Sequence, residues 1–531
     1  MPVPHSDLAL GAFSDHGPWQ IDPDRLRWRR GVDELRAAAQ AEVPALVRRR
    51  MLPPLRRFGE AATLLGLALA GWQLRERRTG GTASRAGLSR RLRRAFERLG
   101  PAYIKLGQII SSGQGLFPPE LVDEFKRCRD QVPAETFAVV RRVVEEDLGM
   151  PITRAFASFD ETPIAAASIA QVHAARLPGG EEVVVKVQRP SVARLVRRDI
   201  EAMAWIAPLL VGRIPVAALG NPPALVELFA ETIVEELDFR LEAQNMLDVA
   251  RVLHEAGQTI IVVPRPHPEL VTRRVLVMER LHGFQYEDVE GMQRAGVDTD
   301  ELVRALLIAF LEGAMIYGVF HGDFHGGNLL VMPDGRVALF DYGITGRMAE
   351  PQRLAFLRMM LTGAVNDIRG QLEAFRDLGA LPPNADLDAL MRVLKVDQPV
   401  KDPTRMTGDE LVHEIQDLLK GLLKQGAKLP KNLMLYVKNM IFFDGATTRL
   451  APDVNLFDQV TRVYGYFAMH HADRIVRDVG FDPRLLALDL DGFRRTLGLE
   501  EETASLTQRE LVERRQRIQE RLEAVGERSH G

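Results

Sequence analysis

A single lysine in a run of valines is the feature that most restricts how this chain can fold. Lys186 lies in "EEVVVKVQ", Glu181–Gln188, whose β-branched residues favour a strand. A lone lysine in a strand is most often at an exposed edge, but a buried ammonium group is costly unless an acid pairs with it. If Lys186 is buried, the fold must therefore bring a carboxylate to it from a neighbouring element.

The stretch "EELDFRLEAQN" supplies candidate acids for that pair. It belongs to a longer helical pattern, residues 224–253, that follows the lysine strand. Spacings of three and four residues predict that Glu235, Asp238 and Glu242 share one face of this helix, with Glu236 beside them. The sequence therefore predicts that Lys186 pairs with one of these carboxylates.

The pattern of apolar residues predicts an α+β protein of several segments. "AQVHAARL" and "EEVVVKVQ" predict a hairpin that turns at Pro178-Gly179-Gly180. A second hairpin is predicted in "NLLVMPDGRVALFDYG". "RTGGTASRAG", Arg78–Gly87, is rich in small residues and is interpreted as a linker. The predicted segments are an arginine-rich region (1–87), a helical extension (88–150), a sheet-containing lobe (151–283), a helical lobe (284–470) and a helical tail (471–531).

Composition excludes several classes of protein. The net charge of -3 does not favour a nucleic-acid partner, and a single cysteine excludes an intrachain disulfide. The N-terminus has no secretory signal pattern, so we expect a cytoplasmic protein. The apolar segment Ala61–Trp72 has arginines on both sides. It is either an ordinary buried helix, which we favour slightly, or a peripheral membrane contact.

Three polar residues near the second hairpin have the order of a phosphoryl-transfer site. In kinases a catalytic-loop aspartate precedes an asparagine by five residues, and a second aspartate opens a glycine-containing turn after a hairpin. Here Asp323 precedes Asn328 by five, and Asp341 opens the turn Asp341-Tyr342-Gly343. Oxygen ligands of this kind suit Mg²⁺. With the strand lysine and the helix acid, this order predicts a site for ATP and Mg²⁺.

Other residues near this site have supporting roles. We interpret His321 as a residue that orients the backbone before Asp323, and we leave His325 without a role. No pattern of zinc ligands accompanies these histidines. "VLVMERLHG" predicts the strand and hinge between two lobes, with Met278 near the adenine and backbone groups of Glu279 and Leu281 at its edge. The alternative for this stretch is a buried strand that leads to a loop.

Together these motifs resemble the UbiB (AarF-type) atypical kinase-like family, whose members support quinone metabolism. The resemblance covers about residues 95–460. It includes the K-x-G-Q signature in "YIKLGQIISS", the alanine-rich "AAASIAQVH" in place of a glycine-rich loop, "FHGDFHGGN" and "LFDYG". It implies a bilobal protein-kinase-like fold, with 151–283 as N-lobe and 284–470 as C-lobe, a helical N-terminal extension and a helical C-terminal region.

The resemblance also implies roles for individual residues. Lys186 would bind phosphates and pair with Glu242, while Glu236 and Asp238 would form an E-x-D motif met by Lys105. Asp323 would be the catalytic acid, and Asn328 and Asp341 would hold Mg²⁺. The residues expected along the nucleotide are Ala165, Ala166, Ala167, Ser168, Met278, Glu279 and Leu281.

The sequence departs from the family pattern at a few positions. Gly113 and Gly115 stand where relatives carry an arginine and an aspartate, and Phe324 and Gly326 stand where they carry prolines. The turn has Tyr342 in place of phenylalanine. We expect these changes to affect how the K-x-G-Q element closes over the site more than they affect Lys186 or the expected Mg²⁺ ligands Asn328 and Asp341.

Three functions remain open at this point. The first is a kinase-like ATPase or small-molecule or lipid kinase in ubiquinone or related metabolism, with a lipid or quinone precursor as partner. The second is a small-molecule phosphotransferase of the aminoglycoside or choline kinase type, which shares the "HGDxHxGN" loop. The third is a nucleotide-gated scaffold without turnover. The sequence identifies no protein partner.

Overall fold

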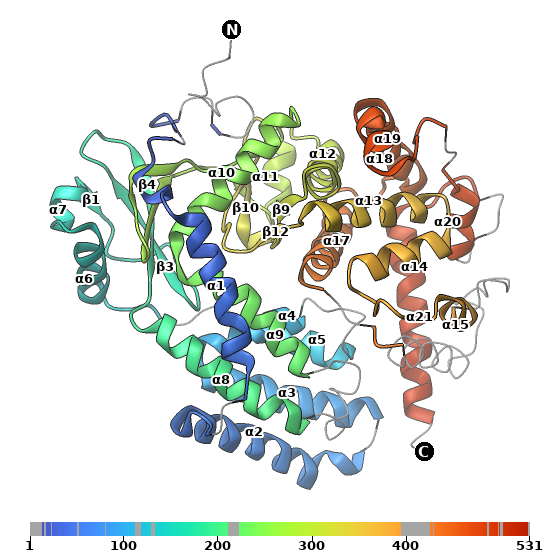
Figure 1. The fold of residues 1–531 in the computed structure, drawn as a ribbon, viewed down its shortest axis with the longest axis horizontal. Coiled ribbons are helices and arrows are strands. Elements are labelled where there is room, and N and C mark those ends of the chain that lie inside the picture. Colours follow the sequence, from blue (N-terminus) through green and yellow to red (C-terminus); the bar gives the residue numbers. More distant parts are fainter. Residues whose placement is uncertain are drawn as a thin grey trace. The chain divides into compact units, whose positions relative to one another are not determined.

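The computed structural model describes residues 13–14, 17–22, 24–49, 52–79, 81–111, 118–128, 133–210, 222–394, 425–427, 430–485, 488–497, 499 and 503–528. The chain divides into two compact units (Figure 1). Unit 1 contains the residues up to Tyr286 together with His321–Met332 and Arg336–Thr345, and unit 2 contains the rest. Helices and sheets are both present, which confirms the predicted α+β class.

A six-stranded antiparallel sheet carries Lys186 in unit 1. The strand order is β1-β3-β4-β7-β6, and β2 pairs with β3. The predicted hairpin is confirmed, with Gly180 at φ +97°, a conformation that glycine adopts without strain. The strands are β1 (Ser158–Phe159), β2 (Ala165–Ala166), β3 (Ala170–Arg176), β4 (Glu182–Gln188), β6 (Pro266–Val271) and β7 (Val275–Glu279).

The alternation of side chains along β4 decides which way Lys186 points. Val183, Val185 and Val187 are buried against the apolar side of helix α6 (Phe137–Leu148). Successive side chains of a strand point to opposite faces, so Lys186 lies on the other face of the sheet. That face is the one on which α10 (Phe239–Glu255) supplies an acid to it.

A second sheet of unit 1 places the loop residues of the site. Its strand order is β5-β11-β10-β8, with bounds β5 (Ile261–Val262), β8 (Phe284–Gln285), β10 (Leu329–Val331) and β11 (Val337–Leu339). The β10–β11 hairpin was predicted and is confirmed. Its two ends are tied by the Phe340 amide, which donates to the Asn328 carbonyl at 2.7 Å. The hairpin therefore holds Asn328 and the Asp341 turn side by side.

Helices complete unit 1. The longer ones are α1 (Val32–Val47), α2 (Leu55–Arg75), α3 (Gly81–Leu99), α4 (Pro101–Ser111), α5 (Pro119–Lys126), α8 (Val192–Leu210) and α9 (Pro222–Ile233), besides α6 and α10. The short ones are α7 (Ile152–Ala155), η1 (Arg27–Arg29), η2 (Arg77–Thr79), η4 (Glu235–Leu237) and η6 (Gly326–Asn328).

The predicted linker Arg78–Gly87 is wrong from Gly81 onward, because α3 begins there. Its small residues serve close packing. The Trp72 indole donates to the Ser84 carbonyl at 3.1 Å, and a Cβ on Gly87 would lie 2.8 Å from the Glu76 side chain. Small side chains let α2 and α3 approach closely, and composition alone does not separate this use from flexibility.

The predicted continuous helix over 224–253 is also wrong. Helix α9 ends at Ile233, the 3₁₀ turn η4 follows, and α10 starts at Phe239. Asp238 is the N-cap of α10: its backbone is extended, with φ -140°, and its side chain accepts from the Arg240 amide at 3.1 Å. Glu235, Asp238 and Glu242 therefore do not share one helix face.

Unit 2 is mainly helical. Its elements are α11 (Val289–Arg294), α12 (Thr299–Glu312), the π-helical turn η5 (Gly313–Tyr317), α13 (Glu350–Ala364), α14 (Ile368–Asp377), α15 (Leu387–Val393), α17 (Lys431–Leu450), α18 (Leu456–His470), α19 (Ala472–Val479), α20 (Leu490–Thr496) and α21 (Gln508–Arg528). The chain passes between the units at β9 (Val319–His321) and β12 (Thr345–Arg347). Within the described residues, no helix combines the length and apolar character needed to cross a bilayer.

The N-cap position of Asp238 gives a stability prediction. Asp238→Ala removes the cap and is expected to lower the free energy of unfolding by about 0.5–2 kcal/mol in a urea titration. Asp238→Asn keeps a capping side chain and loses only the ion pair with Arg240, so it should cost less than about 1 kcal/mol. Equal losses of unfolding free energy in the two variants would show that capping by Asp238 does not contribute to stability.

Candidate active site

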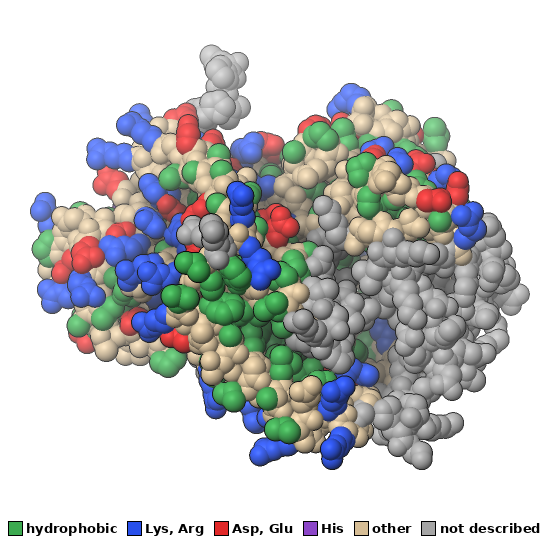
Figure 2. Space-filling view, turned by 60° about the horizontal axis from the view of Figure 1, so that its bottom comes forward, with side chains coloured by type: hydrophobic (Ala, Val, Ile, Leu, Met, Phe, Trp, Pro, Cys, Tyr) green, Lys and Arg blue, Asp and Glu red, His purple; other side chains and the backbone are tan. Residues whose placement is uncertain are grey.

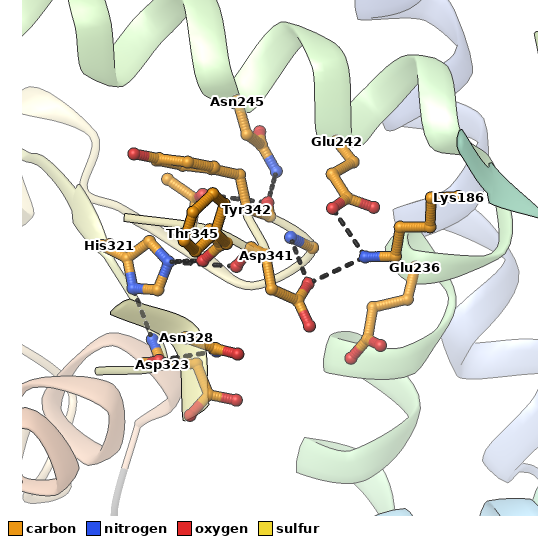
Figure 3. Close-up of polar contacts among 12 residues, drawn as sticks. Lys186, Glu236, Glu242, Asn245, His321, Asp323, Asn328, Asp341, Tyr342 and Thr345 are labelled. Carbon is orange, nitrogen blue, oxygen red and sulfur yellow. Dashed lines mark hydrogen bonds and ion pairs between the residues drawn. The ribbon is translucent and has the colours of Figure 1, made fainter. Parts of the chain in front are cut away.

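Lys186 joins two acids from separate elements of unit 1. Its Nζ lies 2.7 Å from Glu242 Oε1 and 3.1 Å from Asp341 Oδ1 (Figure 3). Lys186 comes from β4, Glu242 from the first turn of α10, and Asp341 from the turn after β11. The predicted pairing of Lys186 with Glu242 is confirmed, and the same ammonium group also holds Asp341.

The charges of this cluster are coupled. Burial acts to lower the pKa of Lys186, but the negative charges of Asp341 and Glu242 outweigh it and raise that pKa above its ordinary value. Burial acts to raise the pKa of Asp341, but Lys186 and Lys105 outweigh it and hold that pKa well below the usual range. Both groups therefore stay charged near neutral pH. The Asp341 side chain is 43% exposed, so a ligand can reach it.

The Asp341 turn is held in an unusual backbone conformation. Asp341 has φ +57°, a left-handed value that costs energy for a residue other than glycine. The Asn245 side chain of α10 donates to the Tyr342 carbonyl at 2.8 Å. The Gly343 amide donates to Asp341 Oδ1 at 3.3 Å, and a Cβ on Gly343 would lie 3.3 Å from the Glu236 side chain. These contacts fix the direction of the Asp341 carboxylate.

His321 orients the two loops of the site. It is buried, and burial lowers its pKa, so the ring is neutral. Its Nδ1 accepts from the Asp323 amide at 3.2 Å, which leaves the proton on Nε2 to donate to the Asp341 carbonyl at 3.0 Å. The predicted orienting role of His321 is confirmed. The exposed His325 caps the short turn η6, where its Nδ1 accepts from the Gly327 amide.

The loop residues Asp323 and Asn328 face Asp341. The Asn328 amide nitrogen donates to the Asp323 carbonyl at 3.1 Å, which directs the amide oxygen away from that bond. Figure 3 shows the side-chain oxygens of Asp323 and Asn328 on the side of the Asp341 carboxylate. The five-residue spacing is what allows this loop to close on itself.

The donor set fits a hard divalent cation. Asn328 offers an amide oxygen and Asp341 an ionised carboxylate, and Mg²⁺ commonly takes one or two protein oxygens and fills its shell with phosphate and water. The described residues contain no group of three or more His, Cys, Asp or Glu side chains placed to hold a metal. A site of this composition therefore suits a cation that arrives with a nucleotide better than a resident metal.

A helix from the N-terminal extension reaches a further acid, Glu236, beside the cluster. Lys105 Nζ of α4 lies 3.1 Å from Glu236 Oε2, and both side chains are largely buried. Burial raises the pKa of Glu236 despite the charge of Lys105. The expected meeting of Lys105 and Glu236 is confirmed. Asp238 differs, because its carboxylate pairs with Arg240 at 2.7 Å.

The glycine of the K-x-G-Q motif has a packing role. A Cβ on Gly107 would lie 2.7 Å from the Phe125 ring of α5 and 3.5 Å from Cys128. Gly107 thus allows α4 to lie directly against α5, and Cys128 is buried beside this contact. The departures at Gly113 and Gly115 lie outside the described residues.

The residues expected along a nucleotide form a compact hairpin and a strand. Ala165 and Ala166 pair with β3 as strand β2, and the Ala167 amide donates to the Ala170 carbonyl at 2.8 Å, so Ser168 lies in a tight turn. Met278 and Glu279 are buried at the end of β7. The Glu279 amide donates to the Arg265 carbonyl at 2.9 Å, so it is not available to an adenine edge; contacts from the Glu279 carbonyl and from Leu281 stay predictions.

Residues before position 45 contact the site in ways that no sequence motif predicted. Arg36 of α1 donates to Asn245 Oδ1 at 2.8 Å, and Gln40 donates to Glu235 Oε1 at 3.0 Å. Ser14 donates to the buried Glu279 carboxylate. No motif signalled these pairs. Asn245 lies in the quoted stretch "EELDFRLEAQN", but only the fold reveals its link to the Asp341 turn.

Comparison with known proteins finds a matching family profile and similar curated proteins. The sequence profile described as the ABC1 atypical kinase-like domain matches residues 127–374. An uncharacterized protein of Mycobacterium tuberculosis is 36% identical in an alignment of 433 positions that covers 76% of this chain and 84% of that protein. A probable protein kinase UbiB of Marinobacter nauticus is 30% identical in an alignment of 377 positions that covers 69% of this chain and 68% of that protein.

This chain belongs to the ABC1 (UbiB/AarF) atypical kinase-like family. An uncharacterized aarF domain-containing protein kinase of the Arabidopsis thaliana chloroplast is a further relative, 32% identical in an alignment of 391 positions that covers 69% of this chain and 72% of that protein. The predicted family and the kinase-like α+β fold are therefore confirmed. The roles of the individual site residues stay predictions.

Gly107 gives a prediction about the K-x-G-Q helix. Gly107→Ala is expected to lower the free energy of unfolding by about 1–3 kcal/mol, because the added Cβ overlaps the Phe125 ring. Gly66→Ala on α2 is the matched control: a Cβ there meets no atom within 4 Å, so it should be neutral or stabilise by up to about 1 kcal/mol. Equal stability of the two variants in urea titration would contradict the packing role.

Proposed function

We propose that this protein binds Mg-ATP at the Lys186 cluster and transfers the γ-phosphoryl group to water or to a small lipid-like acceptor, in support of ubiquinone or related isoprenoid-quinone metabolism. One observation carries the proposal: Lys186 is held between Glu242 and Asp341, with Asn328 and Asp323 on the facing loop. This is the set of groups that phosphoryl transfer requires.

Each group has a defined task in this proposal. Lys186 neutralises phosphate oxygens of the nucleotide, and Glu242 keeps its ammonium group in place. Asn328 and Asp341 would hold Mg²⁺, which supplies positive charge to the phosphates when it is bound. Asp323 accepts the proton of the attacking hydroxyl as the bond between that oxygen and the γ-phosphorus forms. The bond from the γ-phosphorus to the bridging oxygen breaks, and ADP leaves with the electron pair.

The position of α4 supports a small acceptor over a protein one. Lys105 reaches Glu236, and its charge acts on Asp341. A helix of the chain itself thus contributes a side chain to the catalytic cluster, at the place where the family resemblance puts the peptide of a protein kinase. The quinone part of the proposal rests on the likeness to relatives named UbiB.

The deciding experiment is phosphate release from Mg-ATP by the purified full chain, with and without anionic liposomes that contain a quinone-precursor mimic. Release that rises with liposomes supports the proposal. A phosphorylated product of a water-soluble small molecule would instead favour the phosphotransferase alternative. Nucleotide binding without release or product under any condition would favour a scaffold.

The metal ligands give a direct prediction. Asp341→Asn replaces a charged ligand by a neutral amide, so Mg-dependent ATP affinity should fall at least ~tenfold, which corresponds to about 1.4 kcal/mol. Asp334→Asn, in the exposed hairpin turn, is the matched control and should bind like the wild type. Calorimetric titration with Mg-ATP measures both, and unchanged affinity in Asp341→Asn would refute the site assignment.

The Lys105–Glu236 pair gives a prediction with an internal rescue. Lys105→Met removes a positive charge that pairs with Glu236 and acts on Asp341, so the less positive site should bind ATP roughly tenfold more weakly. Adding Glu236→Gln to Lys105→Met also removes the partner acid, so the two positions again carry no net formal charge and affinity should return to within about threefold of wild type. Wild-type affinity in the single variant would contradict a place for Lys105 in the site.

A further inference from the structure

A second site of different chemistry lies in the helical part of unit 1. Helices α2, α3, α4, α5, α8 and α9 surround a cavity of about 120 Å³. Among the described residues its lining is hydrophobic: none of these side chains carries a charge, and Tyr103 is the one among them with a hydroxyl. None of the residues of the Lys186 cluster contributes to it.

The cavity is accessible from the surface of the protein. Several lining side chains, among them Leu69, Leu92 and Leu210, are only partly buried. Leu67 on α2 and Leu209 on α8, next to lining residues, are 63% and 42% exposed. Figure 2, which brings forward the lower edge of Figure 1, shows hydrophobic side chains gathered on this face.

The lining restricts what can enter. Apolar cavities of this size stay dry and accept a group about as large as benzene. A peptide would bring backbone amides and carbonyls into a space with almost no hydrogen-bond partner, which is costly. A phosphate or another ion would lose its hydration without compensation. A hydrocarbon chain meets none of these costs.

The one polar group of the described lining does not face the cavity. Tyr103 is 2% exposed, its hydroxyl oxygen is buried out of reach of a ligand, and the charges of Asp199 and Arg57 act on this group. A ligand in the cavity therefore meets carbon atoms, and its polar end has to stay at the surface.

We infer that this cavity binds the end of a prenyl or acyl chain of an amphipathic lipid, with the polar end of the lipid at the surface. The hydrophobic lining of the cavity thus defines the class of ligand that the protein binds there. Binding itself does not depend on ATP chemistry, whereas its effect on the nucleotide site rests on the proposed function.

Helix α4 connects the cavity to the candidate active site. At 3.6 residues per turn, Tyr103, Leu106 and Ile110 fall on one face of α4, and they line the cavity. Lys105 falls on the opposite face, where it pairs with Glu236. A ligand that shifts α4 therefore shifts Lys105, and by linkage the ligand and Mg-ATP must alter each other's affinity by the same factor.

Binding is tested by calorimetric titration of detergent-free full chain with 1-octanol and geraniol, which represent straight and prenyl chains. We expect saturable binding near one equivalent. 1,8-Octanediol, which carries a hydroxyl at both ends, should bind at least tenfold more weakly. Tighter binding of geraniol assigns a prenyl lipid, and tighter binding of 1-octanol an acyl lipid. Failure of both alcohols to bind would overturn the site.

Two pairs of variants locate the binding. Leu210→Trp and Leu69→Trp place a large ring at partly exposed lining positions and should weaken binding at least tenfold. Leu209→Trp and Leu67→Trp make the same change at neighbouring exposed positions outside the lining and should leave binding unchanged. Equal binding in all four variants would overturn the assignment to this cavity.

The link to the nucleotide site has its own measurement. The affinity for Mg-ATP should change at least twofold in saturating alcohol, and this change should disappear in Leu210→Trp. If alcohol binds without any change in ATP affinity, the link through α4 is overturned, while the assignment of the cavity as a binding site still holds. Absence of ATP binding with alcohol binding intact would refute the proposed function and leave this site in place.

Discussion

The contact on which the candidate active site depends is the buried ammonium group of Lys186. It is shared by two carboxylates that come from a helix and from a loop about a hundred residues apart in the sequence. Removing one member of a buried ion pair typically costs about 3–5 kcal/mol, because the remaining charge stays buried without a partner. Lys186 therefore links the sheet, α10 and the Asp341 turn. A movement of any one of these elements would separate charges that are paired in the cluster.

The supports of this cluster extend into the N-terminal extension. Arg36 holds Asn245, Asn245 holds the carbonyl of Tyr342, and that turn presents Asp341. Lys105 of α4 pairs with Glu236, a further acid beside this turn. The extension of this family member thus contributes both to the position of the Asp341 turn and to the charge of the candidate site. Helix α1, whose sequence shows no kinase motif, takes part in arranging that site.

Several interactions could be predicted because they depend on local pattern. The two hairpins follow from apolar alternation and from turn residues, and the five-residue spacing of Asp323 and Asn328 follows from a short loop that closes on itself. The linker at Arg78–Gly87 and the continuous helix through Asp238 were wrong for a common reason. Small residues and a capping aspartate have more than one use, and their neighbours in space select among them.

The sequence by itself determined that a strand lysine needs an acid, that Asp323, Asn328 and Asp341 have phosphoryl-transfer spacing, and that the chain resembles an atypical kinase-like family. These follow from the cost of burying charge and from chain geometry over a few residues. Only the tertiary structure decided that Lys186 holds Asp341 as well as Glu242, that Asp238 caps a helix, and that α4 lies between an apolar cavity and the acids. These depend on contacts between distant segments, which packing selects and local periodicity does not encode.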